Sequence, residues 1–553
     1  MEKIWLKNYP PSVPPEIDVE QYPSIPAMID SCVAKFGPNK AFTNMGKTLT
    51  FAQTGEMVQR LASFFQNVWK IKKGDRVAVM MPNVLQYPLC VFAILKAGGV
   101  VVNVNPLYTP RELEHQLNDA QVSGVVVIEN FANTLEQVWE KIGRPQVMVA
   151  SLGDLLGPVK GAMVNFVLRK VKKMAPEYRL PGAVTFKQAL AQGASAKFEP
   201  VELSLADLAF LQYTGGTTGI AKGAMLTHGN ICANALQARV WVLTGMEEGK
   251  EVALGPLPFY HIFALTIDVI LFFVLGGRTV MITNPRDLGS IVRAMKRDQI
   301  TVFIGINTLY KMLLQYEPFL AMDHSKVRLC FQGGMAIQES VAAEWKRLFG
   351  KTIINAYGMT ESSPGVVVQR LDVVEGFSQS SGYPVSNTDI SIRQNGEEVA
   401  PGETGEIWVK GPQVFGGYWN NPEETAKSLD KDGYFASGDI GRVDPETGEV
   451  YLIDRKKDMI VVSGFNVYPN EVEAVATALP GVLEAACVGV KSEKSGEAVK
   501  LFVVKDDPNL TEEDVIAHCR KNLTPYKVPK QIEFRDDLPK SNVGKILRRA
   551  LKE

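Results

Sequence analysis

The stretch that decides the fold is Tyr213 to Gly223, which reads Y-T-G-G-T-T-G-I-A-K-G. It follows the apolar run 208–211, which predicts a strand that ends where the glycines begin. Such a loop can surround phosphate oxygens with backbone N–H groups and threonine hydroxyls, and its lysine adds a positive charge. A flexible glycine turn is the plainer alternative. A Walker loop is excluded, because Lys222 is followed by Gly223 where that loop carries serine or threonine.

Length and composition indicate a multidomain protein. The chain has 553 residues, more than one hydrophobic core normally holds. Its net charge of −1 gives no support for nucleic-acid binding. Six dispersed cysteines without a C-x-x-C pair argue against a disulfide framework and a zinc site. The longest apolar run, 262–275, is too short to span a bilayer, and the first residues lack the apolar core of a signal peptide. We therefore expect a protein of the cytoplasm or of a membrane surface on the cytoplasmic side.

Alternating strand and helix patterns predict an α/β fold. Within residues 1–150 and 201–370, short apolar runs such as 251–254 alternate with helical patterns such as Arg60–Trp69. This alternation is typical of parallel sheets covered by helices. Residues 385–453 instead alternate with a period of two, which predicts a smaller β-rich subdomain.

The charged stretch 454–458 separates this region from a small α+β pattern that follows it. We expect an N-terminal domain over 1–454, a hinge at 455–457 and a C-terminal domain over 458–553.

A basic amphipathic helix is predicted at 160–174. The segment carries five cations and no acid, and a helical stripe at Met163, Val167, Val171 and Met174 is apolar. Such a helix can lie in the headgroup region of an anionic membrane. A surface helix that packs on its own domain explains the pattern equally well.

Further motifs follow the glycine-rich loop in a fixed order. They read Pro258-Phe259-Tyr260-His261, Gly333-Gly334-Met335, N-A-Y-G-M-T-E at 355–361, Ser437-Gly438-Asp439, Asp454-Arg455-Lys456-Lys457-Asp458, and P-K-S-N-V-G-K at 539–545. Together they resemble the adenylate-forming superfamily of acyl-CoA synthetases, adenylation domains and firefly luciferase. The similarity is greatest to its bacterial long-chain fatty-acid–CoA ligases. This resemblance implies α/β sheets with a β-rich subdomain and a small, mobile C-terminal domain.

The resemblance also implies a reaction. Members of the family attack the α-phosphate of ATP with a carboxylate, release pyrophosphate and transfer the acyl group from the acyl-adenylate to CoA. The implied substrates are a long-chain fatty acid, ATP and CoA, with Mg²⁺ as cofactor. Both steps depend on positioning and on neutralising negative charge.

Roles for nucleotide-binding residues follow from the same resemblance. The loop residues Tyr213, Thr214, Gly215, Gly216, Thr217, Thr218, Gly219, Ile220, Ala221, Lys222 and Gly223 would surround the β- and γ-phosphates. Thr214 and Glu361 would accompany Mg²⁺, since a hydroxyl and a carboxylate suit a hard cation. The remaining ATP- and AMP-binding residues would be Gly333, Gly334, Tyr357, Gly358, Thr360, Asp439 and Arg455, with Tyr357 on the adenine and Asp439 on the ribose.

The resemblance assigns the catalytic roles to Lys545, Lys222, His261 and Glu361, with Lys545 bridging the carboxylate and the α-phosphate. It places a hinge at Lys457. Ser463, Gly464 and Phe465 would line the CoA channel, and Tyr260, Ile262, Phe263 and Met335 the acyl pocket. Taken alone, His261 would be a core histidine, Asp439 a turn residue and Lys545 part of a solvated basic tail.

Two departures and several alternatives stay open. Val461 stands where some relatives have a lysine, and 262–265 lacks the tryptophan that gates the acyl tunnel of one relative. A ligase for medium-chain or aryl acids, a luciferase-like oxygenase, a peptide-synthetase module or a catalytically silent lipid-binding protein are the competing interpretations. The sequence also leaves open a homodimer, the preferred acyl chain length and entry of the fatty acid from a bilayer.

Overall fold

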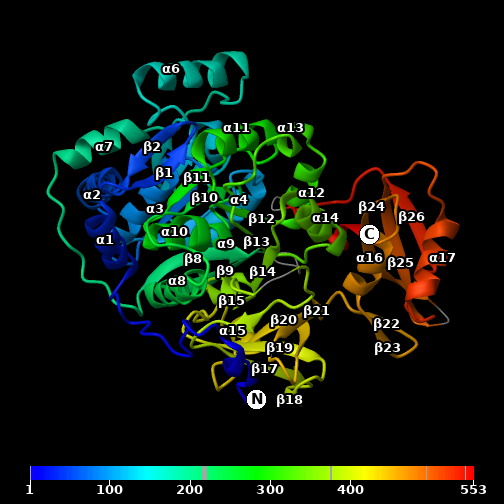
Figure 1. Cartoon of the computed structure of the whole chain (residues 1–553). Coiled ribbons are helices and arrows are strands. Elements are labelled where there is room, and N and C mark those ends of the chain that lie inside the picture. The colour runs from blue at the N-terminus through cyan, green and yellow to red at the C-terminus, as the bar shows by residue number, and fades with distance from the viewer. Residues whose placement is uncertain (1, 215–220, 374–375, 493–494, 542–543, 553) are drawn as a thin grey trace.

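A computed structural model describes residues 2–214, 221–373, 376–492, 495–541 and 544–552. The predictions for Gly215, Gly216, Thr217, Thr218, Gly219 and Ile220 therefore lie outside the described residues. Within the described residues the strands form four sheets, two large and mostly parallel, and two small. Figure 1 shows the large sheets and their helices as one body, with the C-terminal unit beside it.

The larger sheet has nine strands in the order β16-β15-β14-β13-β12-β10-β11-β1-β2. Its parallel strands are β1 (Lys40–Asn44), β10 (Val252–Gly255), β11 (Arg278–Met281), β12 (Val302–Gly305), β13 (Leu329–Gly333) and β14 (Ile353–Gly358). The antiparallel edges are β2 (Lys47–Thr50), β15 (Gly365–Val368) and β16 (Tyr383–Pro384). The helices of this half are α1 (Ile25–Phe36), α9 (Ile262–Ala264), η4 (Leu265–Leu271), α10 (Phe272–Val274), α11 (Leu288–Asp298), α12 (Asn307–Leu314), α13 (Glu317–Leu320) and α14 (Glu339–Phe349), with the short η5 (Thr360–Ser362).

The second sheet has seven strands in the order β7-β6-β5-β3-β4-β8-β9. They are β3 (Arg76–Met80), β4 (Val100–Asn103), β5 (Gly124–Ile128), β6 (Gln146–Ala150), β7 (Val184–Thr185), β8 (Leu208–Thr214) and β9 (Lys222–Thr227), of which β9 is antiparallel to β8. Its helices are α2 (Phe51–Asn67), α3 (Gln86–Lys96), α4 (Pro110–Ala120), η2 (Glu129–Phe131), α5 (Ala132–Trp139), α6 (Pro158–Phe166), η3 (Val167–Val171), α7 (Phe186–Ala194) and α8 (His228–Val242).

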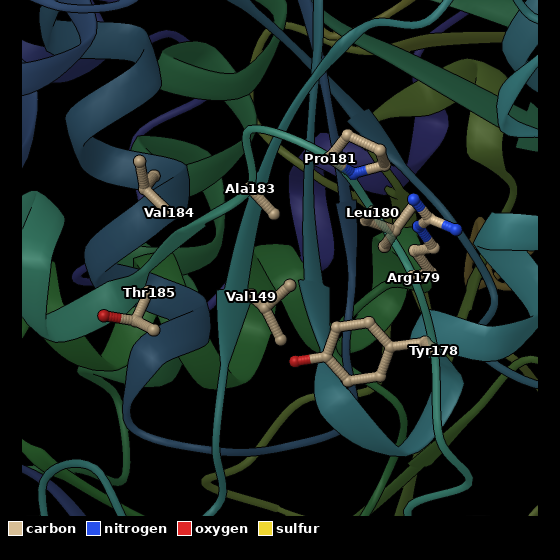
Figure 2. A pocket seen from close by; sticks show the side chains of 8 residues that line it. All are labelled: Val149, Tyr178, Arg179, Leu180, Pro181, Ala183, Val184 and Thr185. Carbon is tan, nitrogen blue, oxygen red and sulfur yellow. The ribbon is translucent and has the colours of Figure 1, made fainter.

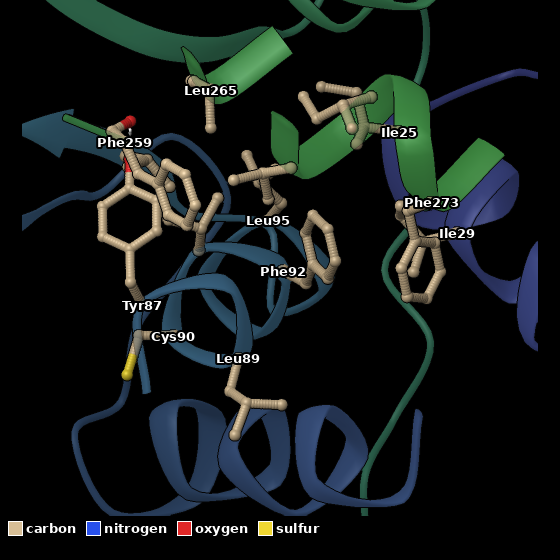
Figure 3. Close-up of a cluster of buried hydrophobic side chains, with 14 of the residues drawn as sticks. Ile25, Ile29, Tyr87, Leu89, Cys90, Phe92, Leu95, Phe259, Leu265 and Phe273 are labelled. Carbon is tan, nitrogen blue, oxygen red and sulfur yellow. Dashed lines mark hydrogen bonds between the residues drawn. The ribbon is translucent and has the colours of Figure 1, made fainter. Parts of the chain in front are cut away.

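Helix α3 joins the two sheets into one core. Ten of its eleven residues are buried, as expected for a helix that is apolar on every side. Figure 3 shows Tyr87, Phe92 and Leu95 of α3 among side chains from α1, such as Ile29, and from the segment 259–273. The Tyr87 hydroxyl donates to the Phe259 carbonyl at 2.6 Å, which fixes the loop between β10 and α9 that carries the histidine motif.

A five-stranded antiparallel sheet follows, in the order β18-β17-β19-β20-β21. Its strands are β17 (Asp389–Gln394), β18 (Glu397–Glu398), β19 (Gly405–Lys410), β20 (Phe435–Val443) and β21 (Val450–Arg455), and α15 (Pro422–Ser428) lies between β19 and β20. Alternate residues such as Ile390, Ile392, Ile407 and Val409 are buried, which matches the period-two pattern of the sequence. The N-terminal η1 (Ile4–Asn8) packs Trp5 into the same core.

The C-terminal unit has its own sheet and hydrophobic core. Its strands are β22 (Ile460–Val462), β23 (Phe465–Val467), β24 (Val482–Ser492), β25 (Gly496–Lys505) and β26 (Gln531–Arg535), covered by α16 (Pro469–Thr477) and α17 (Glu512–Asn522) and followed by η6 (Arg548–Leu551). In Figure 1 this unit, drawn in orange and red, stands apart from the body and meets it near α12 and α14.

The amphipathic helix predicted at 160–174 is present as α6 and the π-helical η3, but it ends at Val171, so Lys172, Lys173 and Met174 lie beyond it. It stands on the outside of the molecule, at the top of Figure 1. Its apolar side chains face solvent, with Met163 58%, Phe166 61% and Val171 64% exposed. No helix in the described part of the chain is long and apolar enough to cross a membrane.

Candidate active site

The strand ends that flank the glycine-rich loop hold the first part of the site. Tyr213 pairs with Gly223 and Thr214 with Lys222 across β8 and β9, so the described ends of the loop are fixed in register. The Tyr213 hydroxyl donates to Asp119 Oδ2 at 2.5 Å, and burial together with this carboxylate raises the pKa of Tyr213. The side chain of Tyr213 is therefore anchored to α4, while Thr214 stays at the loop entrance.

Lys222 is linked to Glu361 through residues that no sequence motif indicated. Its Nζ lies 2.5 Å from Glu424 Oε1 and 5.4 Å from the centre of the Tyr418 ring. The Tyr418 hydroxyl donates to Glu361 Oε1 at 2.7 Å. Tyr418 reaches this position because it forms an isolated β-bridge with Ala224 of β9. The glycines before Tyr418 were the one local signal that its backbone approaches another strand.

Thr214 and Glu361 can contribute to a magnesium site but do not form one alone. Burial raises the pKa of Glu361, and the hydrogen bond from Tyr418 opposes this by favouring the carboxylate. Among the described residues no group of three or more His, Cys, Asp or Glu could hold a metal ion. One carboxylate and one hydroxyl fit Mg²⁺, which usually keeps waters and takes its other ligands from substrate phosphates.

Tyr357, Asp439 and Arg455 form a polar cluster between β14 and the β20–β21 ladder. The Tyr357 hydroxyl donates to Asp439 Oδ2 at 2.8 Å, and Arg455 Nε lies 3.5 Å from Oδ1. Asp439 and Arg455 face each other because they are register partners in that ladder. Burial raises the pKa of Asp439 and the charge of Arg455 lowers it. A carboxylate accepts about four hydrogen bonds, so Asp439 has room for further donors such as a pair of hydroxyls.

Gly333 ends β13, pairs with Ala356 beside this cluster and is followed by Gly334; Gly358 ends β14, and Thr360 begins η5. A Cβ on Gly333 would lie 3.0 Å from the Phe263 ring, and Gly334 has a φ of +80°. A Cβ on Gly334 would lie 3.7 Å from Cε and 3.9 Å from Nζ of Lys545. The side chain of Lys545, which belongs to the C-terminal unit, therefore approaches the exposed backbone of Gly334.

Lys545 lies among charges of both signs. Burial and Arg455 lower the pKa of Lys545 to about 8, and Asp439 opposes that shift. The preceding Gly544 fits closely, since a Cβ there would lie 2.9 Å from Ile306 Cδ1 and from Thr308 Oγ1. The C-terminal lysine is thus brought to the same place as Gly334, Asp439 and Arg455.

His261 caps the short helix α9. Its Nδ1 accepts from the Phe263 N–H at 3.4 Å, so the proton of the neutral ring is on Nε2. Burial and the nearby Lys545 charge lower the pKa of His261 to about 3. The imidazole is therefore neutral at physiological pH.

The predicted acyl-pocket residues do not all lie in the same environment. Phe263 packs on Gly333, and Tyr260 accepts a hydrogen bond from Gln212 Nε2 at 2.7 Å through its carbonyl. Met335 is half-buried, whereas Ile262 is only 1% exposed and belongs to the main core. A cavity of about 420 Å³ lies elsewhere, lined by Tyr178, Leu180, Thr185 and their neighbours beside β6 and β7 (Figure 2).

The predicted hinge and CoA-channel residues lie on the C-terminal side. Lys457 follows β21, and desolvation together with Arg455 lowers its pKa to about 8. Ser463 and Gly464 form the two-residue turn between β22 and β23, both with positive φ. Phe465 stacks on Tyr526 with 4.9 Å between ring centres. In Figure 1 this hairpin lies outside the N-terminal body. Lys545, in contrast, approaches Gly334 of that body.

Comparison with known proteins identifies the family. Residues 16–419 match the AMP-binding enzyme family, and residues 471–545 match the AMP-binding enzyme C-terminal domain. The chain belongs to the AMP-binding enzyme family. It is 50% identical to the long-chain-fatty-acid–CoA ligase of Escherichia coli O157:H7 and 49% identical to that of Yersinia pestis, each over 100% of this chain and 98% of the relative.

A solved structure has the same fold. The ATP-bound structure of MatB from Rhodopseudomonas palustris superposes with a TM-score of 0.83 at 27% identity, over 96% of this chain and 98% of that one. The predicted family and fold class are thereby confirmed.

Proposed function

We propose that the chain is an AMP-forming ligase that converts a long-chain fatty acid, ATP and CoA into acyl-CoA, AMP and pyrophosphate through an acyl-adenylate. One observation carries this proposal. Lys545 reaches Gly334 and Asp439 in a chain that is about half identical, over its whole length, to long-chain-fatty-acid–CoA ligases.

In the first half-reaction a carboxylate oxygen attacks the α-phosphorus, and the bond to pyrophosphate breaks. Asp439 has acceptor capacity for the ribose hydroxyls, and Tyr357 and Gly334 would contact the base. Lys222 supplies a positive charge to the β- and γ-phosphates. Lys545 neutralises charge that develops at the α-phosphate, where a fixed cation in a partly desolvated site is most effective.

The Thr214 hydroxyl and the Glu361 carboxylate are the residues that would hold Mg²⁺. When bound, it would neutralise phosphate charge. The Tyr418 hydroxyl donates to Glu361 and so favours its carboxylate form, against burial, which raises the pKa of Glu361. His261 remains neutral beside Lys545, so it can donate from Nε2 without adding a competing positive charge.

The second half-reaction, attack of the CoA thiol on the acyl-adenylate, would use the other face of the C-terminal unit. Ser463, Gly464 and Phe465 lie on a different hairpin from Lys545, so a rotation at Lys457 would exchange the two faces. Phe465 is 57% exposed, as expected for a side chain that would contact CoA only after this rotation.

Pyrophosphate release from ATP, Mg²⁺ and palmitate by the purified protein tests the proposal. A series of acids from butanoate to octadecanoate, with an aryl acid included, separates long-chain from medium-chain and aryl ligases. A protein that binds palmitate but releases no pyrophosphate would be the catalytically silent lipid-binding alternative. Light-scattering mass in the same preparation tests the homodimer.

The helix α6–η3 supports a second proposal, peripheral association with an anionic membrane. Its exposed apolar residues are Val159, Met163, Phe166 and Val171, and Met174 is exposed just beyond its end. Lys170, Lys172 and Lys173 lie beside them and are exposed, whereas Arg169 is held by Glu129 at 2.5 Å. Apolar side chains next to unscreened cations fit the boundary between acyl chains and anionic headgroups.

Vesicle sedimentation tests this membrane surface. Changing Lys170, Lys172 and Lys173 to Glu should lower binding to anionic vesicles by about 100-fold or more, since each cation near the surface contributes about 1 kcal/mol. The matched control changes the exposed Lys427, Lys521 and Lys530 to Glu, which alters net charge equally. An equal loss of vesicle binding in both variants, or no loss in either, would contradict membrane binding by α6–η3.

A further inference from the structure

The segment before the expected hinge is tied to the C-terminal unit by a buried ionic contact. Asp454, the penultimate residue of β21, has a fully buried side chain. Its Oδ2 accepts from the backbone N–H of Asn470 at 2.7 Å, and its Oδ1 lies 3.3 Å from Arg548 Nη1. Asn470 Nδ2 also donates to the Ile453 carbonyl at 3.0 Å. We call these contacts of Ile453 and Asp454 with Asn470 and Arg548 the Asp454 latch.

The latch uses the first turn of α16 as well as a cation. Asn470 lies in the N-terminal turn of α16, where backbone N–H groups lack intrahelical partners and favour a carboxylate. Asp454 supplies that carboxylate from across the expected hinge. Because Asp454 is buried, separating it from Asn470 and Arg548 would leave an unpaired charge, which is costly.

Arg548 connects the latch to Lys545. It begins η6, three residues after Lys545. The segment around Lys545 is held by the Leu547 N–H, which donates to the Pro539 carbonyl at 2.8 Å, and by the Lys545 N–H, which donates to Ser541 Oγ at 3.1 Å. Fixing Arg548 therefore fixes the segment 544–548, which carries Lys545.

We infer that Asp454 and Arg548 are positioning residues, which hold the C-terminal unit in the arrangement that places Lys545 at Gly334. The latch must open before the unit can turn another face to the site. This inference rests on the proposed function, because it assigns the latch to the half-reaction that uses Lys545.

The chain offers a matched comparison for this inference. Arg548 Nη1 lies 3.3 Å from Asp458 Oδ2, the same distance as from Asp454 Oδ1, and Arg548 also pairs with Glu473 at 2.7 Å. Asp458 and Glu473 are on the C-terminal side of the expected hinge, whereas Asp454 is on the N-terminal side. A network that only stabilised the C-terminal unit would depend on Asp458 no less than on Asp454.

Separate measurements of the two half-reactions test this difference between Asp454 and Asp458. Asp454→Asn should slow pyrophosphate release with palmitate by about tenfold, as expected for losing a charged, buried hydrogen bond. Thioester formation from supplied palmitoyl-adenylate and CoA should not fall. Asp458→Asn should leave both rates within about twofold of the parent. If Asp454→Asn lowers both half-reactions in the same proportion, or if Asp458→Asn matches it, the inference is overturned.

A measurement without catalysis separates failure of the latch from failure of the proposed function. The six native cysteines are buried, so dyes can be placed on Cys substituted for the exposed Lys197 and Glu513. Asp454→Asn should shift or broaden the distance between these dyes, and Asp458→Asn should not. An unchanged efficiency of energy transfer between the dyes in Asp454→Asn overturns the inferred role of the latch. A parent protein that releases no pyrophosphate instead refutes the proposed ligase activity and leaves the dye comparison valid.

Discussion

At the scale of single residues, the protonation of Lys545 and His261 sets what the site can do. Lys545 has a pKa lowered to about 8 by burial and Arg455, and His261 has a pKa lowered to about 3 by burial and Lys545. Near neutral pH the lysine is therefore the charged member of the pair. The charge needed to stabilise a phosphoryl transition state is lost as the pH rises through the pKa of Lys545.

This predicts a falling rate above neutral pH. The adenylation kcat/KM for ATP should decline as the pH rises through about 8, because that parameter reports the free enzyme. Lys545→Arg should remove the decline whatever its residual rate, since arginine stays protonated. Lys457→Arg is the control, because Lys457 also has a pKa lowered to about 8 but lies at the hinge. A decline that vanished in Lys457→Arg and persisted in Lys545→Arg would contradict the assignment.

The candidate-site residues that sequence reasoning predicted differ in kind from those that it did not predict. Tyr357, Asp439 and Lys545 stand in motifs whose residue types and order resemble a known family, and the structure brings them together. Asp119 and Tyr418 stand in no motif. They reach the site only through tertiary pairing, as in the bridge between Ala224 and Tyr418, which local sequence does not encode.

At the scale of elements, apolar periodicity located strands well and helix starts less well. The strand expected at 251–254 is β10 at Val252–Gly255. The helix expected at Arg60–Trp69 is wrong at its start, because α2 begins at Phe51. The signal was present in the capping box of Thr50 and Gln53, which a search for apolar spacing alone does not use.

The turn before Lys545 gives a prediction at this scale. Gly544→Ala should slow adenylation by about tenfold, because a Cβ would meet Ile306 and Thr308 at 2.9 Å and the positive φ costs about 1–2 kcal/mol. Gly496→Ala is the control, since its φ is +77° and its nearest neighbour would be 3.9 Å away. Single-turnover pyrophosphate release measures both. Partial recovery when Ile306→Val and Thr308→Ala accompany Gly544→Ala would identify the contact as the cause, and equal slowing in both glycine variants would point to backbone strain alone.

At the scale of the whole molecule, the number and type of units followed from sequence pattern, but their arrangement did not. A charged stretch such as 454–458 marks a change of pattern, yet it says nothing of which face of the C-terminal unit meets the body. That choice depends on contacts such as Gly544 with Thr308 and Lys311 Nζ with the Leu483 carbonyl. These join residues more than 170 positions apart, beyond any local rule.

The hinge supplies the prediction at this scale. Lys457→Pro should leave pyrophosphate release largely intact and should slow thioester formation from supplied acyl-adenylate by about 100-fold or more, because proline fixes φ and resists rotation. Lys457→Ala is the control for loss of the side chain. Separate assays of the two half-reactions decide the point, and unchanged thioester formation in Lys457→Pro would exclude a hinge at this residue.

The position of β1 in the nine-stranded sheet has a consequence for synthesis. Its partner β11 ends at Met281, whereas β1 ends at Asn44. At a ribosomal rate of roughly 5–20 residues per second, the intervening chain takes roughly 12–50 seconds to emerge. During that interval β1 has its antiparallel neighbour β2 but not β11, so Ala41 and Phe42, both 1% exposed in the finished fold, lack part of their final cover. The nascent chain must therefore keep these apolar side chains from aggregating until β11 is made, which is the kind of interval that chaperones cover.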